Sequence, residues 1–451
     1  MLRLPGLAGQ SYGHDETYTL GVLGGGFEQV LQTVPQSERT PFLYYVVGWG
    51  WAQLFGTGEA GLRSLSVLCG VVTILAVYAA ATRLFDRPAA LLAGALVAVN
   101  PLLIWYSQEA RAYALVILLL ALSLLGLALI RSGRRGSGSA LWAISAALAI
   151  ATHYFAFFPV AVEAILLLRS AGVSKGKVVA AIALPLATLV ALVPLLVGQA
   201  SRHPGDVASP ATLLKLGGIP KQFILGEWAP ANSGAAISIL LLGGLASIFW
   251  LAWRSSETAT RSTVLACAAI ALAAPLAALA GLVLGFDYLV ARNLAVGAPA
   301  ALAALGGLLS GARSGIARAG AVGLLVACLA GSLWAIADPR MQRDDWRAIA
   351  GVLPSSGCHA VLVYPIKDAR PLAAYASGLS IVAVEQAGAG EVVQIWTTRE
   401  RPAPPRLEGL EPISERSGPT YGLRFYRVAD DLADRARDGA RTSGTTPLYE
   451  C

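Results

Sequence analysis

Charged residues are scarce in this chain. Asp, Glu, Lys and Arg make up 14% of its 451 residues, whereas an ordinary soluble protein contains roughly 25%. Hydrophobic residues reach 56%, and the mean hydropathy is +0.62. This balance argues against a soluble protein and predicts a polytopic membrane protein.

The chain also lacks the cysteine spacings of a disulfide framework or a zinc site. The number of cysteines is odd, no pair has CxxC or CxxH spacing, and three lie in apolar runs. We therefore expect all of them to be packing residues. They are Cys69, Cys267, Cys328, Cys358 and Cys451.

Long apolar runs dominate what is present. Runs of roughly membrane-spanning length predict ten transmembrane helices. The fourth and fifth are short, which favours a tilt or a break around His153. The predicted spans lie near residues 60–82, 88–106, 112–130, 140–153, 155–168, 178–198, 233–253, 263–285, 293–311 and 319–337.

Basic residues follow a regular pattern along these spans, because they gather in every second break between them. By the positive-inside rule those breaks are cytoplasmic. The net charge of +7 then sets topology and does not indicate a nucleic-acid partner. We expect a multi-pass protein of the plasma or inner membrane whose alternate breaks face outward.

The pattern divides the chain into four regions. We predict an α-helical polytopic membrane protein with a small C-terminal extracytoplasmic α/β domain. The regions are a first extracytoplasmic loop with interfacial helices (1–58), the transmembrane helical domain (59–337), the α/β domain (338–430) and a disordered tail (431–451).

An acidic pair, Asp15 and Glu16, lies in the first outer loop. Carboxylates are costly at a bilayer face, so they need a reason to be there. Adjacent side chains point in different directions, and this pair can supply one proton acceptor and one orienting or metal-facing group. The alternative interpretation is a solvated loop or a helix N-cap.

The stretch WYSQEARAY is a second polar cluster at an outer helix end. On a helix Gln108 and Arg111 share one face, while Glu109 and Tyr113 share another. This density suits recognition of an anionic or hydroxyl-rich group. A helix start capped by Ser107 and Glu109 is the alternative interpretation.

Other outer positions carry open alternatives. Glu38 and Arg39 precede an aromatic interfacial helix and form either a site or a simple surface ion pair. His153, next to Tyr154, is either a metal or phosphate contact or a buried structural histidine. Arg292 either neutralises a phosphate or anchors a lipid headgroup.

Carboxylates and arginines at an outer lipid boundary suit transfer of a group from a lipid phosphate to an outside acceptor. A transporter or glycolipid flippase would need polar residues near the bilayer midplane and usually paired repeats. The chain shows no repeat, and its charges gather at helix ends. A third alternative is a receptor that acts through the α/β domain, but the outer polar residues would then have no role in its function.

Several stretches carry a resemblance to a known family. They are LRLPGLAGQSYGHDETYTL, ERTPFLYYVVGWGWAQLFG, WYSQEARAYAL, THYFAFF and YLVARNLAVGAP. Together they resemble the membrane glycosyltransferases of the GT-C fold, in the family 39-like group related to protein O-mannosyltransferases and to the lipid A aminoarabinose transferase. The first and third, in that order and spacing, are specific.

The resemblance implies a hexosyltransferase-type enzyme. It would move a sugar from a polyprenyl-phosphate donor to a hydroxyl of a glycan, lipid or protein acceptor on the extracytoplasmic face, with inversion. Asp15 matches the general base and Glu16 its acidic neighbour. Relatives also carry a spanning helix that ends in a phrase like LRLPGL, so we expect the gene to encode one before Met1.

The resemblance also assigns binding roles. Glu38 with Arg39 matches a Glu-Lys pair before proline whose Glu can ligate a divalent metal, and His153 is the other metal candidate. Arg292 resembles a phosphate contact. The predicted substrate-binding residues are Arg39, Gln108, Glu109, Arg111, Tyr113, Tyr154 and Arg292.

Overall fold

The computed structural model divides the chain into two compact units. The first comprises Met1–Leu7 with Thr19–Ala335, and the second Ala8–Tyr18 with Ile336–Cys451. The predicted tail (431–451) and most of the predicted span 233–253 lie outside the described residues. Those residues are 1–428 without 171–174, 203–211, 227–245, 312–313, 354–357, 365–368, 377–379, 383–389, 398–402 and 407–411.

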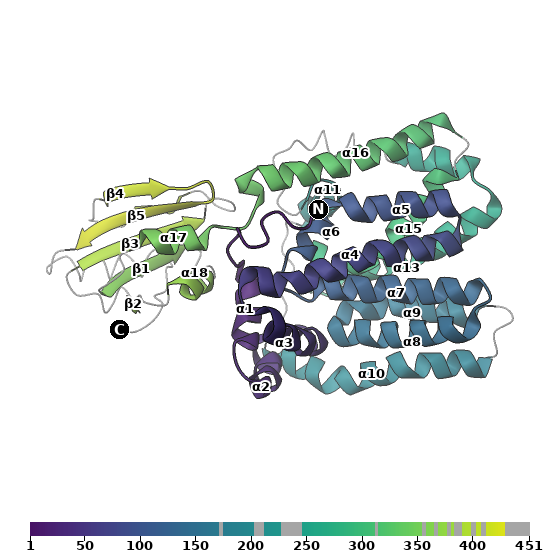
Figure 1. Ribbon diagram of the computed structural model, residues 1–451, viewed down its shortest axis with the longest axis horizontal. Helices are drawn as coiled ribbons and strands as arrows, with labels where there is room; N and C mark the ends of the chain where they lie inside the picture. Colours follow the sequence, from purple (N-terminus) through teal and green to yellow (C-terminus); the bar gives the residue numbers. More distant parts are fainter. Residues whose placement is uncertain are drawn as a thin grey trace. The chain divides into compact units, whose positions relative to one another are not determined.

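The first unit is helical, and its helices lie side by side in antiparallel succession (Figure 1). Helix α7 packs against α4 and α8, α5 against α4 and α15, and α13 against α9 and α15. The long helices are α4 (Glu59–Leu84), α5 (Arg87–Val99), α7 (Tyr113–Arg131), α8 (Arg135–Thr152), α9 (Phe157–Leu168), α10 (Lys175–Arg202), α11 (Thr212–Leu225), α13 (Thr258–Val283), α15 (Ala298–Ser310) and α16 (Gly315–Ala337).

Shorter elements complete this unit. Helices α2 and α3 take the place of the predicted interfacial segments, and α1 begins in the second unit and continues into the first. The short helices are α1 (His14–Leu23), α2 (Phe27–Ser37), α3 (Leu43–Phe55), α6 (Pro101–Ser107), α14 (Ala291–Leu294) and the 3-10 turns η1 (Tyr154–Ala156) and η2 (Ala295–Gly297).

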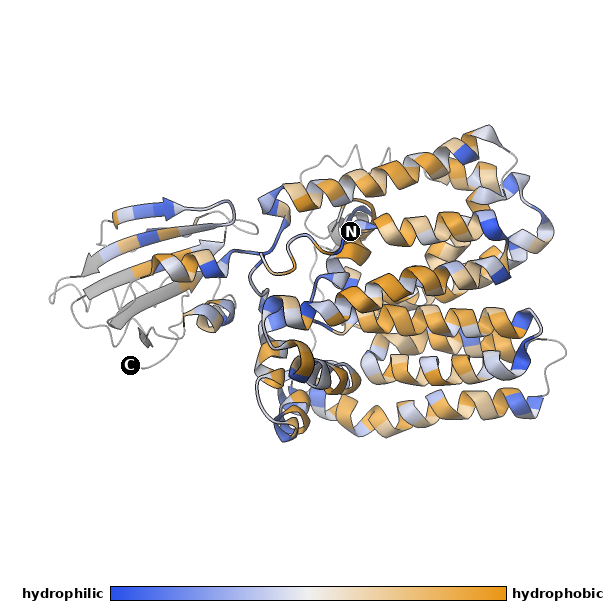
Figure 2. Cartoon of the chain, in the orientation of Figure 1, coloured by the Kyte–Doolittle hydropathy of each residue, from blue (hydrophilic) through white to orange (hydrophobic). Residues whose placement is uncertain are grey.

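Six helices among the described residues are long and apolar enough to cross a membrane, or seven if the bent pair α5 and α6 forms one span. Helix α9 has only 12 residues, and α8 begins with the polar stretch RGSGS. These shortfalls account for two of the ten predicted spans, and most of a third, 233–253, lies outside the described residues. Figure 2 shows hydrophobic residues along most of each helix and hydrophilic residues near the ends. The chain is a multi-pass membrane protein.

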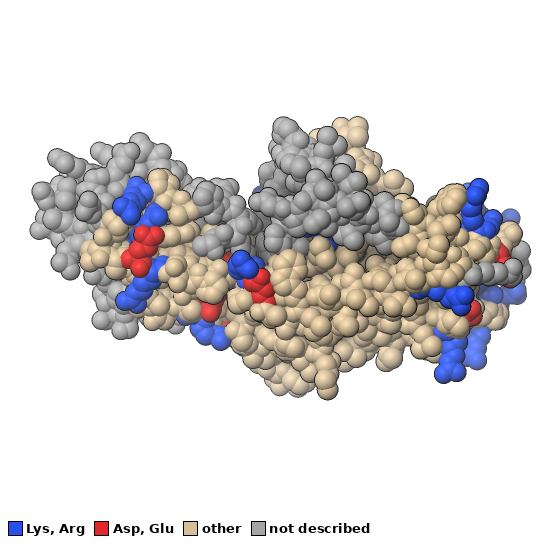
Figure 3. All heavy atoms as spheres, turned by 90° about the horizontal axis from the view of Figure 1, so that it is seen from above, with Lys and Arg blue, Asp and Glu red and all other residues tan. Residues whose placement is uncertain are grey.

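Basic residues mark one end of the helical unit. On the face in Figure 3, Lys and Arg gather there, while the middle of the unit is largely uncharged. Arg83 lies in the last turn of α4 and Arg131 in that of α7, whereas Arg87 and Arg135 begin the helices that follow. This arrangement matches the alternation predicted from the sequence.

The break between α5 and α6 bends the chain by 59°. Pro101 ends α5 because it has no N–H to donate, and the Asn100 side chain caps α6 by accepting from Leu103 N at 3.0 Å. Arg3 and Ser332 donate to the carbonyls freed by the bend, at residues 97–99. Irregular backbone is tolerated at membrane depth only where its polar groups are paired in this way.

A buried carboxyl group links three helices. Glu163 on α9 is 1% exposed. Its Oε1 accepts from Ser123 Oγ on α7 at 3.1 Å, and its Oε2 accepts from Trp142 Nε1 on α8 at 2.8 Å. The three helices therefore share one polar contact inside an apolar core, which fixes their mutual rotation.

Replacing Glu163 tests this link. Glu163→Ala strands the Trp142 N–H, and an unsatisfied buried group costs about 1–3 kcal/mol of unfolding free energy, whereas the Ser123 hydroxyl keeps its bond to Leu120 O. Glu163→Gln keeps an acceptor for Trp142 and a donor for the Ser123 oxygen, so it should stay near wild type. Thermal unfolding in detergent measures both, with Glu28→Ala on exposed α2 as control. Equal losses for Ala and Gln would contradict the hydrogen-bonding explanation.

The second unit contains a five-stranded mixed sheet in the order β2-β1-β3-β5-β4. Strand β1 runs parallel to β2 and β3, whereas β5 is antiparallel to β3 and β4. Its elements are α17 (Trp346–Val352), β1 (Cys358–Tyr364), α18 (Ala369–Tyr375), β2 (Ser380–Val382), β3 (Gly390–Thr397), β4 (Pro412–Ser417) and β5 (Tyr421–Val428), with the turn η3 (Pro339–Met341) ahead of them.

The core of this unit confirms the predicted α/β class. Trp346 and Ile349 on α17 pack with Val393 and Ile395 on β3 and with Leu423 on β5. The sequence analysis did not predict β3 or β4. In β3 every residue from Val393 to Thr397 is buried, so this strand lacks the alternation of buried and exposed side chains by which a half-buried strand is found from sequence.

Candidate functional site

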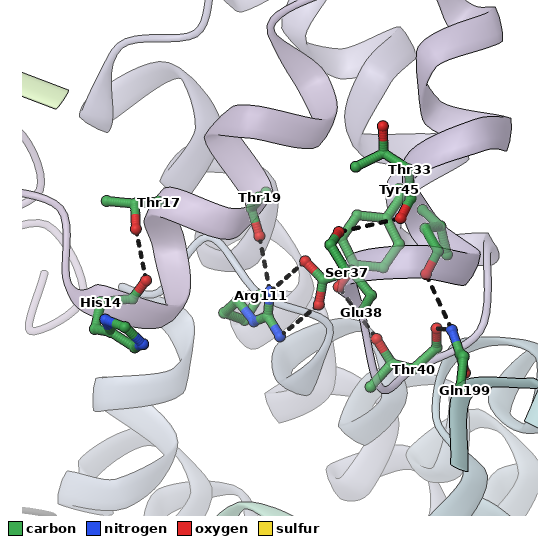
Figure 4. A network of polar contacts seen from close by, with 11 residues as sticks. His14, Thr17, Thr19, Thr33, Ser37, Glu38, Thr40, Tyr45, Arg111 and Gln199 are labelled. Atoms are coloured by element: carbon green, nitrogen blue, oxygen red, sulfur yellow. Dashed lines mark hydrogen bonds and ion pairs between the residues drawn. The ribbon is translucent and has the colours of Figure 1, made fainter. Parts of the chain in front are cut away.

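A buried ion pair lies in the first unit, at the end opposite the basic breaks. Arg111, in the turn between α6 and α7, donates from Nη1 to Glu38 Oε1 and from Nη2 to Glu38 Oε2, both at 3.0 Å. The two side chains are 11% and 2% exposed. Arg111 Nη1 also donates to Thr19 Oγ1 at 3.2 Å (Figure 4). This fork geometry is the strongest form of an Arg–carboxylate contact.

Local structure explains how the two partners meet. Glu38 is the residue at which α2 ends, and its N–H still bonds to Val34 O. The short helix α6 ends at Ser107 with Gln108 as its C-cap, so the next residues form a turn before α7 begins at Tyr113. Glu38 and Arg111 therefore both lie at helix ends, where the backbone is not held in a helix and the side chain can extend toward another helix.

Tyr45 on α3 extends the network. Its hydroxyl lies 3.1 Å from Thr40 Oγ1. Burial raises the pKa of Tyr45 well above its ordinary value; the Arg111 cation opposes this, and the Glu38 carboxylate adds to it. Tyr45 is therefore a neutral hydrogen-bonding group beside the ion pair.

Gln199 joins this network to α10. Its Nε2 donates to Thr40 O at 3.1 Å and to Val34 O at 3.2 Å. Tyr154, one of the predicted substrate-binding residues, donates from its hydroxyl to Gln199 Oε1 at 2.8 Å. The sequence analysis missed Gln199, although a polar residue near the end of a long apolar run was a usable signal.

His153 occupies the break between α8 and α9, outside the helices long enough to span a membrane. Its Nδ1 accepts from Phe155 N at 3.2 Å, and its ring lies 6.0 Å from that of Tyr113. Burial lowers the pKa of His153 to about 4, and the charges of Arg292 and Arg111 act in the same direction. His153 is therefore neutral at ordinary pH, within electrostatic range of both arginines.

The remaining predicted residues of the first unit differ in environment. Gln108 donates from Nε2 to the carbonyls of residues 2 and 5, so its amide holds the N-terminal segment. The main-chain oxygen of the buried Glu109 accepts from Ser66 Oγ at 2.6 Å. Arg39 and Arg292 are both exposed.

The acidic pair lies in the second unit, in the first turn of α1. Glu16 is fully buried, and its Oε2 accepts from Gly13 N at 2.9 Å and lies 3.1 Å from Arg343 Nε. Its side chain thus makes half of a capping box, from the third residue of the helix and not from the N-cap position itself. Asp15 is only half-buried. Acidic side chains are also favourable at this helix end because of the macrodipole.

The donor set does not fit a resident metal at Glu38. Both carboxylate oxygens already face the Arg111 cation, whose charge opposes a second cation. Within the described part of the chain, no group of three or more His, Cys, Asp and Glu side chains gathers in a way that could hold an ion. The pairing of Glu38 with His153 as metal ligands stays a prediction, and no chemical step below depends on it.

The chain is similar to a known protein family in sequence and to solved structures in fold. Residues 38–197 match the family model of the dolichyl-phosphate-mannose-protein mannosyltransferases. No curated protein matches the chain in sequence. Among solved structures, the chain is similar to apo ArnT from Cupriavidus metallidurans, with 13% identity and a TM-score of 0.50 over 93% of this chain and 94% of ArnT.

Two further solved structures match the chain with TM-scores below 0.5. ArnT bound to undecaprenyl phosphate has 12% identity and a TM-score of 0.49, over 93% of this chain and 95% of ArnT. The apo oligosaccharyltransferase of Archaeoglobus fulgidus has 15% identity and a TM-score of 0.43, over 82% of this chain and 60% of that protein.

These comparisons define the class of the protein. The chain has the GT-C fold, as ArnT has. The resemblance predicted from the sequence, to the family 39-like GT-C membrane glycosyltransferases, is confirmed in two respects: residues 38–197 match the mannosyltransferase family model, and the fold is similar to that of ArnT. The matched region includes Glu38, Arg111 and His153.

The Arg111–Glu38 pair yields a stability prediction. Arg111→Ala leaves the Glu38 carboxylate buried beside no guanidinium, and breaking a buried pair costs about 3–5 kcal/mol. Adding Glu38→Gln removes the stranded charge and should recover part of that loss. Thermal unfolding in detergent compares the two variants, with Arg340→Ala, an exposed arginine paired to Asp338, as control. A double variant less stable than Arg111→Ala would contradict this account.

Proposed function

We propose that the protein is a glycosyltransferase that moves a sugar from a polyprenyl-phosphate donor to an acceptor hydroxyl, with Asp15 as general base. One observation carries the choice of base. Of the two adjacent carboxylates, Glu16 is fully buried against Gly13 and Arg343, whereas Asp15 keeps exposed surface at the start of α1. A base must be reachable by the hydroxyl that it deprotonates.

The proposed chemistry balances as a single displacement. The acceptor oxygen attacks the anomeric carbon while the Asp15 carboxylate takes its proton. The bond between the anomeric carbon and the phosphate oxygen breaks, and polyprenyl phosphate leaves with the electron pair. Attack opposite the leaving group inverts the anomeric centre.

An arginine would stabilise the phosphate that carries the developing charge. Arg292 suits this role better than Arg111, because Arg292 is exposed whereas Arg111 is buried and forked to Glu38. His153 is neutral at ordinary pH, so it adds no positive charge of its own to that of Arg292. Arg111 then acts mainly by fixing Glu38 and the end of α2.

Substrate class and orientation are part of the same proposal. The matched family is named for dolichyl-phosphate-mannose, a polyprenyl-phosphate hexose, which supports a hexosyl donor. The clustering of basic residues at one end of the helical unit supports a cytoplasmic position for that end. The acidic loop and the α/β domain would then face outward from the plasma or inner membrane, where a glycan, lipid or protein hydroxyl accepts the sugar.

Asp15→Asn tests the base. Removing a general base lowers turnover by roughly 10² to 10⁴, and the isosteric amide should leave folding and membrane insertion intact. The measurement is transfer from a polyprenyl-phosphate mannose in proteoliposomes, with Glu28→Gln on α2 as the matched acid-to-amide control. Near-normal turnover of Asp15→Asn would remove Asp15 from the mechanism.

Arg292→Ala tests the phosphate contact. A charge-assisted hydrogen bond contributes about 1.5–3 kcal/mol, so donor affinity should fall roughly tenfold to hundredfold while the acceptor KM stays unchanged. Arg292→Lys keeps the charge and should lose less. Binding of polyprenyl phosphate to the purified variants measures the effect, with Arg340→Ala as control. Equal donor affinity in all of them would favour the headgroup-anchoring interpretation.

A further inference from the structure

The loop that carries Asp15 is built into the same compact unit as the α/β domain. Residues 8–18 group with the chain after Ile336, although the sequence places them far apart. Arg347 donates from Nη2 to Ala8 O at 3.4 Å. Tyr375 on α18 accepts from Tyr12 N at 2.7 Å. The α/β domain therefore contacts the main chain of this loop at more than one point.

Side chains reinforce this attachment. Ser11 Oγ donates to Asp345 Oδ1 at 3.2 Å and accepts from Arg347 N at 3.0 Å. The guanidinium carbon of Arg370 on α18 lies 3.8 Å from the centre of the Tyr18 ring. The Ser11 contacts lie near the start of the loop, and the Tyr18 contact lies in α1. The contacts therefore span the length of residues 8–18.

Arg343 makes the charged contact in this set. Its Nη1 donates to Gln10 Oε1 at 3.1 Å, and its Nε lies 3.1 Å from Glu16 Oε2. The side chains of Arg343 and Glu16 are 4% and 1% exposed. The guanidinium of Arg343 thus joins Gln10, which precedes α1, to Glu16 in the first turn of α1.

The same Glu16 oxygen accepts from Gly13 N, which closes the first turn of α1. Asp15 belongs to that turn, so whatever fixes the turn also fixes the backbone of Asp15 and the direction in which its side chain leaves the helix. A buried ion pair sets orientation more firmly than an exposed one, because any movement would strand a charge away from water.

We propose that Arg343 is a positioning residue for Asp15, and that the α/β domain works as the holder of the acidic loop. This inference rests on the proposed function, in which Asp15 is the base. Arg343 touches neither sugar nor phosphate in this scheme. It acts through Glu16, by keeping the first turn of α1 formed and Asp15 aimed at the acceptor.

Kinetics of Arg343→Ala, Arg343→Lys and Arg340→Ala test the proposal in full-length protein. Arg343→Ala should lower kcat at least tenfold, because the Asp15 carboxylate is no longer oriented toward the acceptor. The donor KM should stay unchanged, because the donor contacts are kept. Arg343→Lys retains one charged contact to Glu16 and should recover part of the loss. Arg340→Ala, whose guanidinium pairs with Asp338 on the surface, should match wild type. An unchanged kcat in Arg343→Ala would overturn the inference.

A double variant separates positioning from general damage. If Arg343 acts through Asp15, then Arg343→Ala should lower the residual rate of Asp15→Asn by less than twofold. A full tenfold loss in the Asp15→Asn background would show that Arg343 acts elsewhere and would overturn the inference.

Hydrogen exchange gives a readout independent of activity. In Arg343→Ala, peptides covering residues 8–18 should exchange at least tenfold faster, while those of α4 and α7 keep their protection. Unchanged exchange in the loop would overturn the inference even if turnover fell. Faster loop exchange together with a fully active Asp15→Asn would instead defeat the proposed function and leave the holding role of Arg343 intact.

Discussion

Pairing of polar groups away from water is the constraint on which the rest of this structure depends. Over half of the chain is hydrophobic, so each polar side chain carried inside needs a partner. Arg3 bonds to carbonyls at the α5–α6 break, and Glu163 bonds to Trp142 and Ser123. These contacts explain why the helices stop, bend and rotate where they do.

The same constraint separates structural charges from candidate chemical ones. In the sequence, Glu16 and Glu38 are as plausible as Asp15 for a chemical role. In the structure Glu16 is buried against Arg343, and Glu38 is buried against Arg111. Asp15 retains exposed surface. A general base must be reachable by the hydroxyl that it deprotonates. Burial therefore distinguishes carboxylates that a motif alone leaves equal.

Sequence pattern predicted most of the fold because hydrophobic length and basic breaks are local signals. They located α4, α7 and α10 directly, and the change to shorter helix and strand patterns after Ala337 indicated the α/β class of the second unit. They did not locate β3, whose pairing with β1 and β5 depends on distant parts of the chain. The order of strands in a sheet is a tertiary property that no short pattern contains.

The candidate site shows the same limit. Asp15, Glu38 and Arg111 could be selected from sequence as charged residues at helix ends, but their partners could not. Nothing near Glu16 in the sequence indicates Arg343, and nothing near Arg111 indicates Thr19. Such pairs form only when the fold brings helix ends together, and that is where sequence reasoning stops.

The cation that faces Glu38 in this structure is the guanidinium of Arg111. The family resemblance predicts a carboxylate able to hold a divalent metal there, whereas in this structure the guanidinium of Arg111 faces both of its oxygens. This guanidinium links the end of α2 to the turn before α7. The same guanidinium also bonds to Thr19 on α1. Two arginines, Arg111 and Arg343, thus hold successive parts of α1, each within its own unit.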